Sequence, residues 1–131
     1  KTIELMQKKW SKWTPDPFIW VHRSGVSQYN MFTPRSLVEV LKEIYRTSSW
    51  DQIKTLFPSG GISGTLKSYN VKQVYGKTGT LRHNHNLSGY LITKRGKILV
   101  FSLMVNHFTS PTSDIRAAIG ELLNWLKRKV K

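Results

Sequence analysis

Two short polar segments of this sequence combine residue types that suit an anionic ligand. Residues 24–30 read Ser-Gly-Val-Ser-Gln-Tyr-Asn, and residues 77–80 read Lys-Thr-Gly-Thr. On a strand, a lysine supplies a fixed cation and threonine hydroxyls donate hydrogen bonds. A glycine without a side chain leaves the backbone edge open to an extended ligand. A Lys-Thr-Gly triplet is short enough to occur by chance, so its weight depends on the rest of the chain.

The two segments follow the order of a signature for acyl transfer through a serine. That signature combines S-x-x-K with a serine/asparagine loop and a K-T-G strand. The loop and the strand occur here in that order, but the 131 residues contain no S-x-x-K. The stretch from Ser63 to Lys67 is one residue too long. We therefore expect the nucleophile and its lysine base to lie outside this chain.

Further matches extend the pattern over most of the sequence. They are residues 24–30 running on to Thr-Pro-Arg at 33–35, Gly-Ile-Ser-Gly-Thr-Leu at 61–66, Gly-Lys-Thr-Gly-Thr-Leu at 76–81 and Leu-Ser-Gly-Tyr at 87–90. With these pieces, residues 18–106 resemble the D-alanyl-D-alanine carboxypeptidase/endopeptidases, the low-molecular-mass class C penicillin-binding proteins. The resemblance implies that residues 1–131 are the C-terminal portion of such a catalytic domain, in the periplasm or cell envelope.

The resemblance also implies a chemistry and a set of site residues. The substrate would be a peptidoglycan stem peptide ending in D-Ala-D-Ala, cleaved through a serine acyl-enzyme that β-lactams also form. The catalytic residues would be Ser27, Asn30 and Lys77, and the substrate-binding residues Thr78, Gly79 and Thr80. The partners implied are this peptide, β-lactams and the N-terminal part of the same parent protein, with no cofactor, metal ion or nucleic acid.

Each of these residues would have a distinct role. Lys77 would place its ammonium near the loop serine and the substrate carboxylate, and the hydroxyls of Thr78 and Thr80 would bind that carboxylate. The Thr80 N–H would form half of an oxyanion hole, and Gly79 would leave room for the ligand. Ser27 would pass a proton to the leaving amine, while Asn30 would hold the peptide amide.

Some positions depart from the family pattern. Two residues separate Ser27 from Asn30, whereas the general motif is S-x-N. His22 and Arg23 stand where Asp and Gly are expected, and Ser63 stands where Asp is expected. These differences indicate either a looser loop or a divergent branch of the family.

Apolar spacing predicts the elements that position the two polar segments. We expect helices over residues 3–13, from Thr33-Pro34 to about residue 46, over 49–57, and from Ser110-Pro111 onward. We expect strands over 18–21, around 77–80, over 87–93 and over 98–106, with Gly96 at positive φ in the last hairpin.

In the last predicted strand, residues 98–106, both the odd-numbered and the even-numbered positions are mostly apolar. This pattern predicts that both faces of the strand are buried. The fold class is therefore α+β, a partial penicillin-binding-protein/β-lactamase-like transpeptidase fold with helices covering both faces of an antiparallel sheet. If the remaining strands belong to the N-terminal part, residues 98–106 should show an unpaired edge.

Composition supports a second hypothesis. The chain has 21 Lys and Arg against seven Asp and Glu, a formal charge of +14. Such a balance is typical of proteins with anionic partners, so a basic domain binding nucleic acid or anionic glycan through Trp10, Trp13, Arg23 and Arg82 is an alternative. The scattered basic residues and the absence of a nucleic-acid motif weigh against it.

Other features leave a third hypothesis and two smaller expectations. A catalytically inactive relative that binds stem peptides without cleaving them also fits the missing S-x-x-K. The tryptophan stripe near the N-terminus is expected to pack in the core, and His83 and His85 are expected at the surface instead of binding a metal. No run of about 18 apolar residues occurs, so no transmembrane segment is expected.

Overall fold

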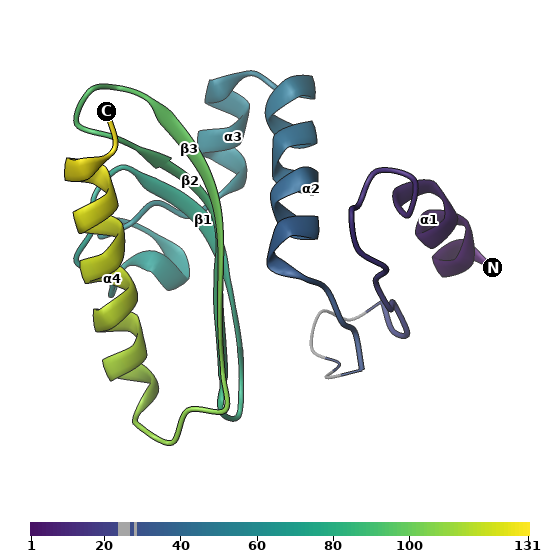
Figure 1. The fold of residues 1–131 in the computed structure, drawn as a ribbon. Coiled ribbons are helices and arrows are strands. Elements are labelled where there is room, and N and C mark those ends of the chain that lie inside the picture. Colours follow the sequence, from purple (N-terminus) through teal and green to yellow (C-terminus); the bar gives the residue numbers. More distant parts are fainter. Residues whose placement is uncertain (24–26, 28) are drawn as a thin grey trace.

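A three-stranded antiparallel sheet with helices on both faces forms the body of the molecule (Figure 1). The computed structural model describes residues 1–23, 27 and 29–131. Its elements are α1 (Thr2–Trp10), α2 (Pro34–Thr47), α3 (Trp50–Leu56), the 3₁₀ turn η1 (Gly64–Leu66), β1 (Val74–Leu81), β2 (Asn84–Ile92), β3 (Ile98–Asn106) and α4 (Thr112–Lys129). The strand order is β1-β2-β3, which confirms the predicted α+β class.

Two helices begin at the predicted caps. The Thr33 side chain accepts a hydrogen bond from the Ser36 N–H, and Pro34 occupies the first turn of α2. Ser49 and Gln52 form a reciprocal capping box at the start of α3. Such caps satisfy backbone donors that a helix leaves unpaired, and each contributes about 1 kcal/mol.

The N-terminal predictions need correction. Helix α1 ends at Trp10 and has no buried residue, so the expected core packing of the tryptophans is wrong. Trp13 is 46% exposed and contacts Trp10 edge-to-face, with ring centroids 5.3 Å apart. The strand expected at residues 18–21 is reduced to one bridge between Ile19 and Met31. An apolar run of four residues that directly follows a proline is too short to form a strand without a longer partner.

The β1–β2 hairpin is longer than predicted. Strand β2 begins at Asn84 instead of residue 87, because Arg82 and His83 alone make the turn. His83 adopts φ 60°, in the left-handed region, whereas Arg82 has no positive φ. The turn therefore differs from type I′, in which both central residues have positive φ, and from type II′, in which the first one does. In the next hairpin Gly96 has φ +80°, as predicted.

The sheet is packed on both faces, as the apolar parities of β3 predict. On one side Leu99, Phe101 and other odd-numbered residues of β3 pack beneath α4, around Ile119 and Leu123. On the other side Tyr90 anchors α2 and α3, and its hydroxyl donates to the Leu41 carbonyl at 2.6 Å. Strand β3 pairs only with β2 among the described residues, which confirms the expected edge.

Helix α4 begins one residue later than predicted, with Pro111 just before its first turn. Helix α4 has 18 residues and is amphipathic, with Lys127, Arg128 and Lys129 in its last turn. Among the described helices, none has the length and apolar character needed to cross a membrane.

Candidate active site

The outer edge of β1 is covered at its start and open at its end. The Gly76 N–H donates to the Pro58 carbonyl at 3.1 Å, and the Gly60 N–H donates to the Val74 carbonyl at 2.8 Å. Because backbone groups two residues apart on a strand point the same way, the next outward N–H groups are those of Thr78 and Thr80. The predicted Lys-Thr-Gly-Thr segment therefore coincides with the open part of the edge.

A groove runs along this open edge. Its lining residues are Ser27, Asn30, Phe32, Lys77, Thr78, Gly79, Thr80, Leu81, Asn84 and Asn86. The fold thus brings the two polar segments that the sequence singled out to the same surface hollow. Ser24, Gly25, Val26 and Gln28 of the first segment lie outside the described residues.

Lys77 contributes a cation to the groove wall. Its side chain is exposed, and Nζ donates to the Thr78 carbonyl at 2.8 Å. None of the ion pairs found within the described part of the chain involves Lys77. An ammonium without a neighbouring carboxylate retains its full attraction for an incoming anion.

The two threonine hydroxyls are each held by a side chain behind the strand. Thr78 Oγ1 donates to Thr65 Oγ1 of η1 at 2.7 Å. Thr80 Oγ1 lies 2.7 Å from His85 Nδ1, because the hairpin register pairs Thr80 with His85. Both hydroxyls therefore have fixed positions before any ligand arrives.

His85 is fully buried, which corrects the expectation of a surface histidine. Its Nε2 lies 2.5 Å from the hydroxyl of Tyr69, which is also buried. Burial lowers the pKa of His85, and the nearby Arg116 cation lowers it further, so the imidazole is neutral at pH 7. His85 and Leu87 are two residues apart on β2, so their side chains lie on the same, buried face of the sheet. A strand prediction that began at Asn84 would have indicated this.

His83 does not share that face. It lies in the hairpin turn with an exposed side chain, and its Nδ1 donates to the Phe108 carbonyl at 2.8 Å. The two histidines therefore lie in different settings, one in the turn and one in the core.

Asn30 connects the loop wall of the groove to the preceding segment. Its Oδ1 accepts from the N–H groups of Val21 and His22 at 2.8 and 3.1 Å. Its Nδ2 donates to the His22 carbonyl at 3.1 Å. These contacts give the side chain a structural role in shaping the loop, a role that the spacing alone did not indicate.

Ser27 lies at the start of the turn that Asn30 closes. The Asn30 N–H donates to the Ser27 carbonyl at 3.2 Å, and Ser27 Oγ accepts from the Tyr29 N–H at 3.3 Å. An oxygen that accepts one hydrogen bond still has its own proton to donate. The geometry therefore leaves the Ser27 hydroxyl able to exchange a proton in the groove.

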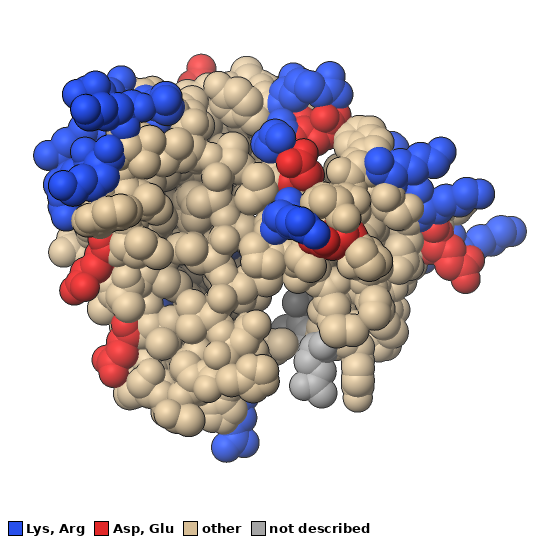
Figure 2. Space-filling view, viewed as in Figure 1, with Lys and Arg blue, Asp and Glu red and all other residues tan. Residues whose placement is uncertain are grey.

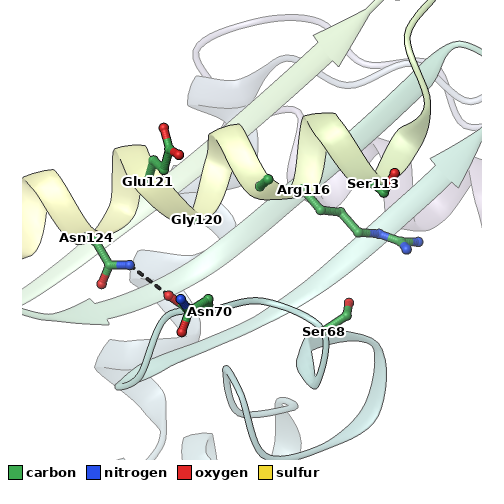
Figure 3. A pocket seen from close by; sticks show the side chains of 8 residues that line it. Ser68, Asn70, Ser113, Arg116, Gly120, Glu121 and Asn124 are labelled. Atoms are coloured by element: carbon green, nitrogen blue, oxygen red, sulfur yellow. Dashed lines mark hydrogen bonds between the residues drawn. The ribbon is translucent and has the colours of Figure 1, made fainter.

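A second hollow lies between α4 and the segment after η1 (Figure 3). Asn124 of α4 donates to the Asn70 carbonyl there at 2.8 Å, and Arg116 extends along the helix toward Ser113. The buried Nε of Arg116 has no hydrogen-bond partner among the described residues. The two hollows share no lining residue, and the second contains none of the predicted site residues.

Basic side chains gather at the end of the molecule where α4 finishes (Figure 2). There the Lys94 N–H donates to the Lys127 carbonyl, and Lys127 Nζ donates to the Lys72 carbonyl. Thr80 pairs with His85, and about eight residues of β2 lie between His85 and the basic end. At the rise of a strand, this is a distance of about 25 Å. The groove and the basic end are therefore distinct surfaces.

Comparison with known proteins identifies the family to which the chain belongs. Residues 16–127 match the D-Ala-D-Ala carboxypeptidase 3 (S13) family, and the chain belongs to this family. It is 29% identical over 101 residues to D-alanyl-D-alanine carboxypeptidase DacB of Haemophilus influenzae, covering 72% of this chain and 21% of that protein. It is 27% identical over 116 residues to penicillin-sensitive carboxypeptidase A of Dictyostelium discoideum, covering 79% of this chain and 22% of that protein.

Solved structures show the same fold. Penicillin-binding protein 4 (dacB) from Haemophilus influenzae superimposes with a TM-score of 0.79, over 96% of this chain and 31% of that one. The same protein complexed with a β-lactam gives a TM-score of 0.78, with 23% identity and 32% of that chain covered. The chain therefore has part of the penicillin-binding-protein fold and spans about a fifth of the length of its curated relatives.

Proposed function

We propose that the protein containing this chain cleaves peptidoglycan stem peptides that end in D-Ala-D-Ala, and that it binds β-lactams. The observation that supports this most directly is the groove shared by Ser27 and the Lys77–Thr80 segment. Membership of the D-Ala-D-Ala carboxypeptidase family supports the same substrate class. The reaction proposed is hydrolysis through a serine acyl-enzyme, outside the cytoplasm.

The groove suits an extended peptide with a terminal carboxylate. Such a peptide would pair with the open backbone edge of β1, where Gly79 offers no side chain to block it. The Lys77 ammonium and the Thr80 hydroxyl would bind the carboxylate, and the Thr78 hydroxyl would join them by turning its proton from Thr65 to the ligand. The Thr80 N–H would stabilise the oxyanion of the tetrahedral intermediate, a contribution of about 3 kcal/mol per donor.

The loop wall would serve the leaving group. Ser27 would pass a proton to the amine of the departing D-alanine, since its hydroxyl donates as well as accepts. Asn30 would hold the peptide amide and, through its contacts with His22, keep the loop in place.

This chain would supply binding groups and not the nucleophile, since it contains no S-x-x-K. We propose that residues 1–131 are the C-terminal portion of the catalytic domain. The N-terminal part would contribute the nucleophile and pair with the free edge of β3.

Acylation by a labelled penicillin tests this proposal. The 131-residue chain should form no covalent adduct, whereas the parent protein should form one that Lys77→Ala strongly slows. Lys42→Ala, which removes a surface ion pair with Glu39, is the matched control and should react like the wild type. A serine adduct on the isolated chain would show that the nucleophile lies within it. A parent that binds the peptide but is never acylated would instead be the inactive relative.

The charge of +14 supports a second candidate, binding of an anionic polymer at the basic end. Reversing Lys94, Arg95 and Lys97 to glutamate should abolish such binding without affecting acylation, because this end lies far from the groove. Fluorescence titration with a nucleic acid or an anionic glycan at several salt concentrations measures it. Affinity weaker than micromolar at low salt would exclude this candidate.

A further inference from the structure

Behind the groove, three side chains form a continuous hydrogen-bonded chain from the core to the surface. The Tyr69 hydroxyl contacts His85 Nε2, and His85 Nδ1 contacts Thr80 Oγ1. Tyr69 and His85 are 2% and 0% exposed, whereas Thr80 lines the groove. A change at the buried end of this chain can therefore reach a group that meets the ligand.

The burial of Tyr69 sets the direction of these hydrogen bonds. In the described part of the chain, the hydroxyl of Tyr69 has one hydrogen-bond partner, His85 Nε2. A buried O–H that donates to nothing is costly, so the Tyr69 proton must point at Nε2. Nε2 is then the acceptor nitrogen of a neutral imidazole, and Nδ1 carries the ring proton.

The same reasoning assigns the proton of Thr80. Because Nδ1–H donates to Thr80 Oγ1, that oxygen accepts from behind and its own O–H is directed elsewhere. The side open to it is the groove. With the opposite tautomer, the Thr80 proton would be used on Nδ1, and the groove would meet an acceptor oxygen instead.

We propose that Tyr69 and His85 are positioning residues that hold the Thr80 hydroxyl as a hydrogen-bond donor to the carboxylate of the ligand. A carboxylate oxygen carries negative charge, so a fixed donor binds it more strongly than it binds the neutral carbonyl of an amide or an ester. The hydrogen-bond direction stands on the contacts alone, whereas the carboxylate ligand rests on the proposed function.

Nearby charge supports a neutral histidine in this arrangement. The Arg116 cation acts electrostatically on both Tyr69 and His85. At His85 it disfavours the positively charged imidazolium. Burial acts in the same sense on His85 and raises the pKa of Tyr69, so the phenol keeps its proton.

The tautomer can be tested on the 131-residue chain without any enzyme assay. Histidine labelled with ¹⁵N distinguishes the two nitrogens by NMR, with the exposed His83 as an internal reference. At pH 7, His85 should be neutral with its proton on Nδ1, and Tyr69→Phe should shift the Nε2 resonance most. A proton on Nε2, or an imidazolium at pH 7, would overturn the proposal.

Steady-state kinetics of the parent protein test the effect on the ligand. His85→Leu should raise KM for a peptide with a free C-terminal carboxylate by about five- to tenfold, the equivalent of one lost hydrogen bond. It should leave kcat and the KM of the matching C-terminal amide nearly unchanged, since the bond forms in the ground state as well. An equal effect on acid and amide would contradict the proposal.

Two further variants separate positioning from stability. His85→Asn keeps a side-chain N–H near the position of Nδ1, so it should restore KM to within about twofold of the wild type. In a Thr80→Val background, His85→Leu should have no further effect, because the two residues act through one hydroxyl. Additive effects would overturn the relay. A parent without peptidase activity but with the expected tautomer would refute the proposed function and leave the relay intact.

Discussion

The two walls of the groove are built in different ways. The strand wall, Lys77 to Thr80, belongs to a sheet whose central strand is packed on both faces. In the part of the chain that the structure describes, the loop wall around Ser27 is closed at its base by one bridge, between Ile19 and Met31, and by side-chain hydrogen bonds of Asn30. A sheet positions groups through many backbone bonds, whereas a loop depends on a few side chains. The strand wall should therefore be sensitive to packing changes and the loop wall to single polar substitutions.

Glycines of β1 and β2 show a similar contrast between packed and open positions. A Cβ added at Gly89 would lie 2.1 Å from the Tyr75 carbonyl oxygen, and one at Gly76 would lie 2.7 Å from the Ser88 carbonyl oxygen. At Gly79 the nearest atom, on the side chain of Asn86, is 3.9 Å away. Packing therefore requires glycine at positions 76 and 89. It does not at position 79, where the proposed ligand would give a reason for glycine.

The largest predicted effect is the loss of stability in Gly89→Ala. The backbone contacts at this site cannot yield without disturbing the β1–β2 register, so we expect a loss of about 3 kcal/mol. In thermal unfolding of the chain this corresponds to a melting temperature lower by roughly 10 °C.

The matched control is Gly79→Ala, which should change the melting temperature by less than about 2 °C. In the parent protein the same substitution should slow acylation on the order of 100-fold by displacing the ligand from the strand edge. Equal stability losses at the two glycines would remove the distinction between packed and open halves of β1.

A smaller effect is expected for the loop wall. Asn30→Ala removes three hydrogen bonds to Val21 and His22 from a largely exposed segment. We expect about 1 kcal/mol of lost stability but a clear rise in amide hydrogen exchange at residues 21 and 22. Asn30→Asp keeps the two acceptor contacts and should show a smaller rise. Unchanged exchange in Asn30→Ala would show that the loop is held in another way.

The sequence predicted the strand wall better than the loop wall for a physical reason. Caps at Thr33 and Ser49 and the apolar parities of β3 are local signals, and the elements follow them closely. The position of residues 18–21 depends on a partner distant in sequence, and no local pattern reveals that Ile19 meets only Met31. The buried site of His85 was missed because an Arg-His turn resembles neither of the usual hairpin turns.

The groove residues were identified from motifs, but their supports were not. The contact between Thr78 and Thr65 joins the motif at residues 76–81, on a strand, to the motif at residues 61–66, in a loop. The sequence shows these two motifs only as separate matches. Likewise, the Tyr69–His85 contact links the segment between η1 and β1 to strand β2, across 16 residues of the chain. Contacts of this kind, which hold the groove residues from behind, depend on tertiary geometry. Residue types and spacing do not encode that geometry directly.

The smallest predicted effect concerns acid pH and the base of the loop wall. Asp16 accepts hydrogen bonds from Arg35 Nε and Thr33 Oγ1, both at 2.6 Å, and so ties the segment before the loop to the start of α2. The hydrogen bond from Arg35 comes first and that from Thr33 second in lowering the pKa of Asp16, to about 2.

A carboxyl whose pKa is lower in the folded state stabilises the fold only while it is ionised. The contribution of Asp16 is therefore complete above its ordinary pKa of 3.8 and disappears as the pH falls from there toward 2. Asp16→Asn should reduce the acid-induced loss of stability in this window, when melting temperatures are measured from pH 6 to pH 2. Asp114→Asn, which alters a first-turn carboxylate of α4 outside the described ion pairs, is the matched control. Identical pH profiles for Asp16→Asn and the wild type would show that the hydrogen bonds of Asp16 with Arg35 and Thr33 do not hold the loop wall in solution.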